Sequence, residues 1–287
     1  IPAATTLLTP EIVRSLKESG LDQMAMSLDA STEALHDPFR GVEGAYRRTM
    51  KGLRWAKAAG LPIQINTVLS RHNIHEVDRL IETVEKMGVV FWEVFFLVQT
   101  GRGKAVGGLS ARECEAVFPK LYAMTRRVPF IVKVTEAPHF RRYVAQQQLQ
   151  AAGVDTDQLP WHGKELPAQL RRVLGPRGSI GRAPQGVNAG KGHLFISHEG
   201  EVFPSGFLPL SAGNIRKRSL SEIYRESQLF QTLRDADRLK GRCGSCEYRW
   251  ICGGSRARAY ASTGDLLEED PWCGYIPKTE RTHAPSA

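Results

Sequence analysis

The sequence has no long hydrophobic run, and its N-terminus has no basic segment followed by an apolar core. A membrane-spanning helix needs about 20 apolar residues in succession, and a secretory signal needs both N-terminal features. No residue type dominates either, because 41% of residues are hydrophobic and 24% charged, which excludes disorder over the whole chain. These absences predict a soluble, cytoplasmic, globular protein with no membrane partner, of one large or two smaller domains.

Cysteine is scarce, with five residues in 287, of which four lie near the C-terminal end. A secreted disulfide scaffold would distribute an even number of cysteines through a short chain. One compact group in a long chain instead indicates metal ligation in a reducing cytoplasm. The isolated Cys114 is predicted to be a small buried hydrophobic residue and not a ligand. The grouped cysteines are Cys243, Cys246, Cys252 and Cys273.

The positive charge is spread along the chain, since 39 basic residues face 30 acidic ones for a net charge of +9. Such an excess suits an anionic small molecule as well as a nucleic acid. Nucleic-acid binding would be indicated by basic residues interleaved with aromatic ones, and the chain concentrates these nowhere. A nucleic-acid partner is therefore disfavoured. Basic pairs such as Arg141-Arg142 usually form a solvated face, although a substrate with several carboxylates would also use them.

Helices and strands alternate in the first half of the chain, which predicts an α/β fold with parallel strands joined by right-handed crossovers. The run at 89–98 is nearly unbroken in apolar residues and predicts a strand buried on both faces. Asn73 with Glu76, and Ser110 with Glu113, predict capping boxes at two helix starts. The predicted strands are 24–28, 63–69, 89–98 and 130–134, and the predicted helices begin near residues 9, 45, 73 and 110.

Four strands are fewer than the eight of a complete βα barrel. The chain also opens on a helix and begins with Ile1. We therefore expect that an N-terminal part of the barrel is missing.

The second half is predicted to hold a smaller α+β module after an irregular connector. Two short apolar stretches flank Glu199-Gly200, which predicts a β-hairpin. Ser219 with Glu222 predicts another capped helix. The predicted organisation is a partial barrel at 1–137, a connector at 138–186, the small module at 187–280 and a tail at 281–287.

The grouped cysteines follow the spacing Cys-x2-Cys-x5-Cys-x20-Cys. Four thiolates suit either tetrahedral zinc or a [4Fe–4S] cluster. Zinc ribbons usually present two Cys-x2-Cys pairs, whereas here the second pair is separated by 20 residues, which favours the cluster. Gly253-Gly254 would let the backbone approach closely, and neighbouring arginines would offset the cluster's charge. These arginines are Arg242, Arg249, Arg256 and Arg258. A zinc-binding nucleic-acid module without catalysis remains the alternative.

The residues from Cys243 to Tyr260, with Thr263-Gly-Asp265 and Glu269 to Cys273, closely resemble the C-terminal module of radical S-adenosylmethionine (SAM) enzymes with a SPASM or twitch domain. The resemblance is strongest to the branch that includes haem and haem d1 biosynthesis enzymes. Gly200 to Gly206 and Gly213 to Ile215 also resemble that branch. Ser205 stands where a full SPASM module would have a cysteine, which implies a single auxiliary [4Fe–4S] cluster in a twitch-like module.

The resemblance implies that the first half is the later part of a radical SAM partial (β/α)6 barrel, and it suggests the SAM contacts. Ser27-Leu28-Asp29 resembles the family's Ser-x-Asp, which contacts the ribose, and Asn66 would bind the ribose or carboxylate. The segment from Leu97 to Gly103, with Arg102, would cradle the adenine. From the residues alone, a helix-entry turn at Asp29 and a strand-end hydrogen bond at Asn66 are equally good interpretations.

The resemblance also implies a function. Reductive cleavage of SAM at a second [4Fe–4S] cluster would give a 5′-deoxyadenosyl radical, which abstracts hydrogen from a tetrapyrrole or peptide substrate. A ferredoxin or flavodoxin would supply electrons, and the auxiliary cluster would relay an electron or position the substrate. The family's Cys-x3-Cys-x2-Cys and Gly-Gly-Glu motifs are absent from these 287 residues. The chain alone is therefore expected not to cleave SAM, and its catalytic residues are not assigned.

Overall fold

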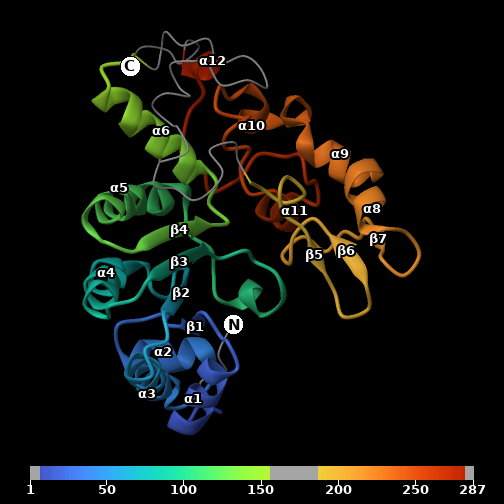
Figure 1. Ribbon diagram of the computed structural model, residues 1–287. Helices are drawn as coiled ribbons and strands as arrows, with labels where there is room; N and C mark the ends of the chain where they lie inside the picture. Colours follow the sequence, from blue (N-terminus) through green and yellow to red (C-terminus); the bar gives the residue numbers. More distant parts are fainter. Residues whose placement is uncertain (1–6, 156–186, 282–287) are drawn as a thin grey trace. The chain divides into compact units, whose positions relative to one another are not determined.

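The computed structural model describes residues 7–155 and 187–281 (Figure 1). The chain divides into two compact units. The first unit comprises Ile1–Leu97, Val106–Leu109 and Ala116–Thr135, and the second comprises Val98–Ala105, Ser110–Glu115 and Glu136–Ala287.

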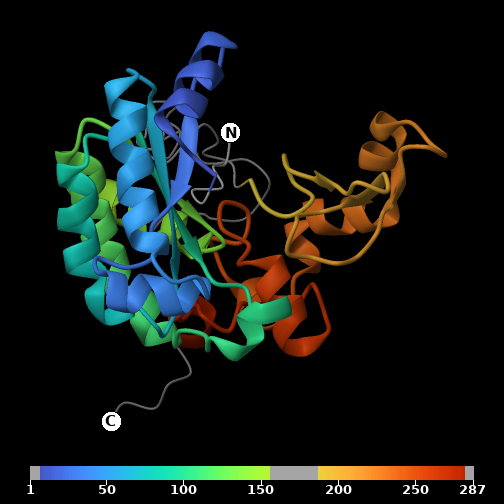
Figure 2. The ribbon, with the colours of Figure 1, turned by 90° about the horizontal axis from the view of Figure 1, so that it is seen from below.

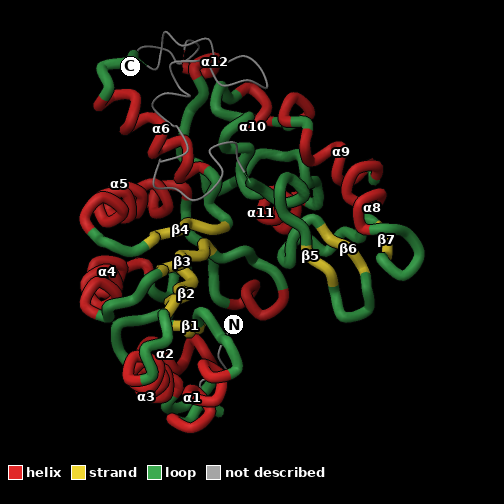
Figure 3. Tube along the Cα trace, in the orientation of Figure 1, coloured by secondary structure: helices red, strands yellow, loops and turns green. Residues whose placement is uncertain are grey.

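The first unit is built on a parallel sheet of four strands in the order β1-β2-β3-β4. Its helices gather along one face of the sheet (Figures 2 and 3). The α/β fold class with parallel strands is thereby confirmed. The strands are β1 (Met24–Ser27), β2 (Ile63–Leu69), β3 (Phe91–Phe96) and β4 (Ile131–Thr135). The helices are α1 (Pro10–Glu18), α2 (Glu33–Arg40), α3 (Ala45–Ala58), α4 (Val77–Lys86) and α5 (Ala111–Arg127), whose first residues belong to the second unit.

Burial alternates along the central strands, so that the sheet has one buried apolar face and one partly exposed face, which carries most of its polar side chains and is called the polar face below. In β3 the side chains of Trp92, Val94 and Phe96 are buried, whereas those between them are partly exposed. The prediction that 89–98 is buried on both faces is therefore wrong. Phe91 and Phe95 on the partly exposed face hide the alternation in the sequence, and only Glu93 reveals it.

Of the two capping boxes predicted in this half of the chain, one is confirmed and the other is wrong. The Thr9 hydroxyl accepts the Ile12 N–H at 3.2 Å, and Ser110 and Glu113 form a reciprocal capping box. The Asn73 amide instead donates to the carbonyls of Asp29 and Val68, and residues Ile74–Glu76 form a 3-10 turn before α4. Tertiary partners thus outcompete the local cap that the sequence favours.

The second unit contains a small antiparallel sheet, short helices and one longer helix. The predicted hairpin is present, since β5 (Phe195–Ile196) pairs with β6 (Glu201–Phe203), and β6 pairs with β7 (Gly213–Asn214). Ser219 and Glu222 form the predicted capping box. The helices are α6 (His139–Ala151), α8 (Leu220–Glu226), α9 (Gln228–Arg234), α10 (Gly241–Ser245), α11 (Arg256–Thr263) and α12 (Lys278–Arg281). Two further 3-10 turns lie at Gly101–Ala105 and Ala236–Arg238.

Helix α6 corrects the prediction that residues 138–186 form an irregular connector. Its buried side chains include Phe140, Val144 and Leu149, which lie on more than one side of the helix. The sequence therefore shows no single apolar stripe, and the run Gln146-Gln147-Gln148 reads as polar, although glutamine is a good helix former. The rest of the predicted connector from residue 156 and the tail from residue 282 lie outside the described residues.

Within the described ranges, no helix combines the length and the apolar character that a membrane crossing requires.

Candidate metal centre and cofactor face

The grouped cysteines line one pocket within the second unit. Cys243 lies on α10, Cys246 ends that helix and Cys252 precedes α11, while Cys273 comes from the returning chain. None of them forms a disulfide. The structure thus brings together the residues that the spacing singled out. Cys114 is fully buried and does not line the pocket, as predicted.

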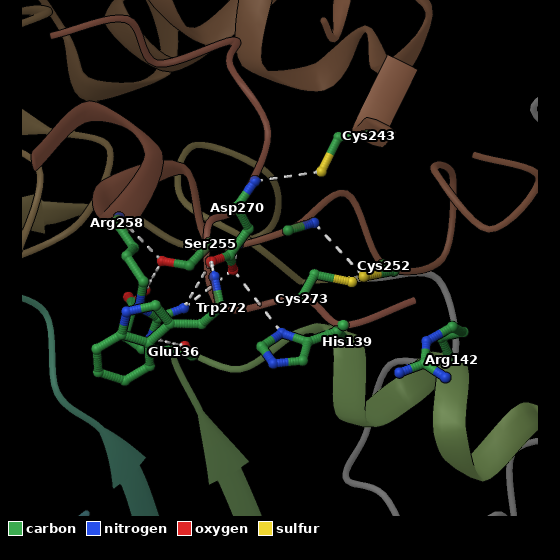
Figure 4. Close-up of polar contacts among 12 residues, drawn as sticks. Glu136, His139, Arg142, Cys243, Cys252, Ser255, Arg258, Asp270, Trp272 and Cys273 are labelled. Atoms are coloured by element: carbon green, nitrogen blue, oxygen red, sulfur yellow. Dashed lines mark hydrogen bonds and ion pairs between the residues drawn. The ribbon is translucent and has the colours of Figure 1, made fainter. Parts of the chain in front are cut away.

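Main-chain N–H groups point at the thiols. Cys246 Sγ accepts from the Tyr248 N–H at 3.4 Å, Cys252 Sγ from Gly254 at 3.5 Å and Cys243 Sγ from Asp270 at 3.5 Å. The bond from Asp270 to Cys243 is drawn in Figure 4. Such bonds stabilise sulfur that carries negative charge.

The double glycine after Cys252 is required by the local backbone. Gly253 and Gly254 have φ angles of 69° and 62°, in the region that favours glycine. A Cβ atom at residue 254 would lie 3.0 Å from Cys243 Sγ and 2.6 Å from a nitrogen of Arg256. Glycine at 254 therefore lets the backbone lie closer to the Cys243 thiol than a side chain would allow.

Burial raises the pKa of every thiol in the pocket, and that of Cys273 to about 12. The Arg256 guanidinium opposes this effect at Cys243, and Arg142 opposes it at Cys273. The thiols of the metal-free protein therefore retain their protons at neutral pH. A metal that binds here must displace those protons, and its charge then stabilises the thiolates.

Asp270 fixes the returning chain beside the pocket. Its carboxylate accepts N–H bonds from Ser255 at 2.7 Å and Trp272 at 3.1 Å, and it pairs with Arg258. Figure 4 shows these groups converging on Asp270, whose main chain points at Cys243. The loop that supplies Cys273 is thereby held by contacts that are independent of any metal.

The donor set fits a [4Fe–4S] cluster. Four thiols with N–H donors and nearby guanidinium groups are the surroundings that such clusters favour. In the parts of the chain that the structure describes, no three His, Cys, Asp or Glu side chains converge closely enough to hold a single metal ion. Cys243, Cys246, Cys252 and Cys273 are the residues that could hold the cluster.

The predicted SAM contacts fall within or beside the sheet of the first unit, apart from Arg102. Ser27 and Asn66 are register partners in β1 and β2, and both are partly exposed on the polar face. Leu97 follows β3, and its N–H donates to the Leu69 carbonyl at 3.1 Å. Arg102 lies in the turn Gly101–Ala105 of the second unit.

Asp29 differs from the others because its carboxylate is fully buried. One oxygen accepts the Val68 N–H at 2.8 Å, and the other lies 2.6 Å from Arg40 Nε. Its partners are thus supplied by the chain itself, which agrees with the interpretation of this segment as a structural turn.

A row of polar side chains on the same face of the sheet was not predicted. The Gln64 amide donates to Asn66 Oδ1 at 2.7 Å and to Glu93 Oε2 at 3.1 Å. Glu93 Oε1 accepts from Lys133 and Thr135, each at 2.7 Å. The signal in the sequence is the placement of polar residues at alternate strand positions between buried apolar ones.

Comparison with known proteins decides the family. A model described as the radical SAM superfamily matches residues 3–84, and one described as an iron-sulfur cluster-binding domain (SPASM) matches residues 188–247. The AdoMet-dependent heme synthase of Methanosarcina barkeri is 40% identical over 272 residues, which cover 95% of this chain and 73% of that protein. The chain belongs to the radical SAM superfamily.

Further relatives agree with this assignment. The AdoMet-dependent heme synthase of Nitratidesulfovibrio vulgaris is 37% identical, covering 95% of this radical SAM chain and 70% of that protein. The solved structure "Native anSMEcpe with bound AdoMet" superposes with a TM-score of 0.61 at 14% identity, over 95% of this chain and 68% of that one. This likeness confirms the fold.

The resemblance to radical SAM enzymes of the haem-biosynthesis branch is thereby confirmed, and with it a family of enzymes that use SAM and iron–sulfur clusters. The zinc-binding nucleic-acid alternative is set aside. The SPASM match includes Cys243 and Cys246 but ends before Cys252. The assignment of the remaining ligands therefore depends on the pocket geometry.

Proposed function

We propose that this radical SAM protein modifies a tetrapyrrole, and that Cys243, Cys246, Cys252 and Cys273 hold its auxiliary [4Fe–4S] cluster. The observation that supports the cluster most strongly is the convergence of these four thiols on one pocket. The observation that supports the substrate is the identity of 40% and 37% to two AdoMet-dependent heme synthases. A tetrapyrrole with carboxylate side chains also suits the net charge of +9.

When bound, the cluster supplies a one-electron redox centre. The residues around the pocket have distinct tasks. The N–H groups of Tyr248, Gly254 and Asp270 stabilise the thiolates, and the guanidinium of Arg256 lies 3.6 Å from Cys243 Sγ. A ferredoxin or flavodoxin is the proposed electron donor.

In the first unit, Ser27 and Asn66 are proposed to contact SAM from the polar face of the sheet. Leu97, which follows β3, is proposed to contact its adenine. Asp29 is proposed to act indirectly: its carboxylate holds the Val68 N–H and so fixes the loop after β1 against the end of β2. Gln64 is proposed to orient the Asn66 amide, because it joins Asn66 to Glu93.

The experiment that tests the substrate class measures 5′-deoxyadenosine formation from SAM under anaerobic reducing conditions. Because these 287 residues contain no Cys-x3-Cys-x2-Cys, the protein assayed carries that motif together with them. Addition of an iron porphyrin with carboxylate side chains is expected to stimulate formation, with conversion of the porphyrin. Stimulation by a peptide and not by the porphyrin would contradict the proposed substrate.

A further inference from the structure

Arg142 is a buried cation beside the cysteine pocket. It projects from α6 (Figure 4). Its side chain is 6% exposed and lines the pocket together with Cys252 and Cys273. Its guanidinium lies 4.7 Å from the centroid of the Tyr275 ring. The buried Nε atom has no hydrogen-bond partner among the described residues. A donor N–H and a full positive charge are thus available at the side of the pocket.

Glu115 forms an ion pair with Arg142. Both of its carboxylate oxygens accept from Arg142 Nη2, at 2.5 and 2.6 Å. One of them also accepts the N–H of Gly274, the residue after Cys273, at 3.3 Å. Glu115 is 26% exposed and does not line the pocket. Of the two charged groups, the Arg142 guanidinium lines the pocket and the Glu115 carboxylate does not.

The two charges act on the pocket in opposite senses. Besides burial, which raises the pKa of Cys273, the positive charge of Arg142 lowers this pKa and the negative charge of Glu115 raises it. The charge of Arg142 is screened less than a surface charge would be, because its guanidinium is almost fully buried. The charges of Arg142 and Glu115 act in the same way on any other group in the pocket that gains or loses charge.

We infer that Arg142 and Glu115 set the reduction potential of the auxiliary cluster, Arg142 raising it and Glu115 lowering it. The inference rests on the proposed function, since it requires that the four cysteines hold the cluster. Reduction adds one electron to the cluster, so a nearby cation stabilises the reduced form and a nearby anion destabilises it. Neither Arg142 nor Glu115 is a ligand of the cluster, and both act on it through their charge.

The test is a redox titration of the anaerobically reconstituted protein, followed by electron paramagnetic resonance of the reduced cluster. Arg142→Gln is expected to lower the midpoint potential, and Glu115→Gln to raise it. Glutamine at 115 can still accept the Gly274 N–H, so the loop is retained. Arg142→Lys keeps the charge and is expected to stay close to the wild type. Arg218→Gln and Glu226→Gln, which remove an exposed ion pair outside the pocket, are the matched controls and should leave the potential unchanged.

Opposite shifts are the decisive feature, because a purely structural role would disturb the cluster in the same sense in both variants. Shifts of equal sign, or no larger than those of the controls, would overturn the inference. If Arg142→Gln loses iron, the potentials of Glu115→Gln and Arg142→Lys decide the question. Absence of iron and sulfide from the wild-type protein would overturn the proposed function itself, whereas a loaded protein with unmoved potentials overturns only the role of the pair.

Discussion

Arg258 and Asp270 form a buried ion pair in the second unit, with Arg258 Nη1 2.9 Å and 3.1 Å from the two carboxylate oxygens. Their side chains are 1% and 0% exposed. The Arg258 guanidinium also lies 4.0 Å from the centroid of the Trp272 ring. Since the Asp270 main chain donates to Cys243 Sγ, this pair connects the stability of the unit to the geometry of its thiols.

Removal of one partner leaves a buried charge without compensation. Arg258→Met is expected to lower the free energy of unfolding by about 3–5 kcal/mol, measured by urea denaturation of the metal-free protein. Arg218→Met, which breaks the exposed pair with Glu226, is the control and should cost less than about 1 kcal/mol. Equal losses in the two variants would contradict the importance of the buried pair.

The buried hydroxyl of Thr67, on β2, connects this strand to β3 and to the end of β1 in the first unit. Thr67 Oγ1 accepts from Trp92 Nε1 at 2.8 Å and donates to the Leu28 carbonyl at 2.7 Å. Thr67→Val keeps the shape and leaves both groups unpaired, so we expect a loss of about 2 kcal/mol or more in unfolding free energy. Thr67→Ser keeps the hydroxyl and should cost less. A valine variant as stable as the serine variant would be the contrary result.

The stability of the first unit is expected to depend on pH through His36. Its Nδ1 accepts the Asp29 N–H at 3.0 Å, and burial, with the charge of Arg40, lowers the pKa of His36 to about 4. Between pH 6.5 and 4 the unfolded chain binds a proton at this residue that the folded chain does not. The contribution of His36 is therefore complete above pH 6.5 and is lost as the pH falls toward 4.

His36→Asn tests this dependence, because asparagine offers an acceptor for the Asp29 N–H and does not titrate. Urea denaturation at about pH 7.5 and about pH 5, on either side of the ordinary histidine pKa, should show a smaller loss of unfolding free energy in the variant than in the wild type. The same loss in both proteins would mean that other groups account for the pH dependence.

The sequence predicted a strand or helix correctly where its buried residues recur at the regular spacing of that element. The strand Ile63–Leu69 has the predicted bounds, because Gly60 and Pro62 end the preceding helix and polar residues alternate within the strand. Helix α6 was missed because its buried residues lie on several sides of the helix and form no single apolar stripe in the sequence. Residues that pack against a second element cannot be distinguished from loop residues by composition alone.

The cysteine group could be predicted because metal ligation constrains residue type and spacing together. The residues whose contacts support the cysteine pocket could not be predicted. Ser255 Oγ donates to Glu136 Oε2 at 2.5 Å across 119 residues of sequence, and Arg142 meets Glu115 across 27. At Asp29 the sequence was misleading in another way: the residue matches a family motif for binding SAM, but its carboxylate is buried and bonded to the chain itself. Such relations depend on the tertiary fold and leave no local pattern.

The measurement that tests the central claim most directly is the iron and sulfide content of the anaerobically reconstituted protein, with its absorbance near ~400 nm. Alanine at Cys243, Cys246 or Cys252 is expected to abolish both, and alanine at Cys273 to leave a partly occupied three-cysteine site. Alanine at the buried Cys114, which does not line the pocket, should leave them unchanged. Full iron and sulfide in the Cys243, Cys246 and Cys252 variants, or stoichiometric zinc in a colourless wild-type protein, would contradict the assignment.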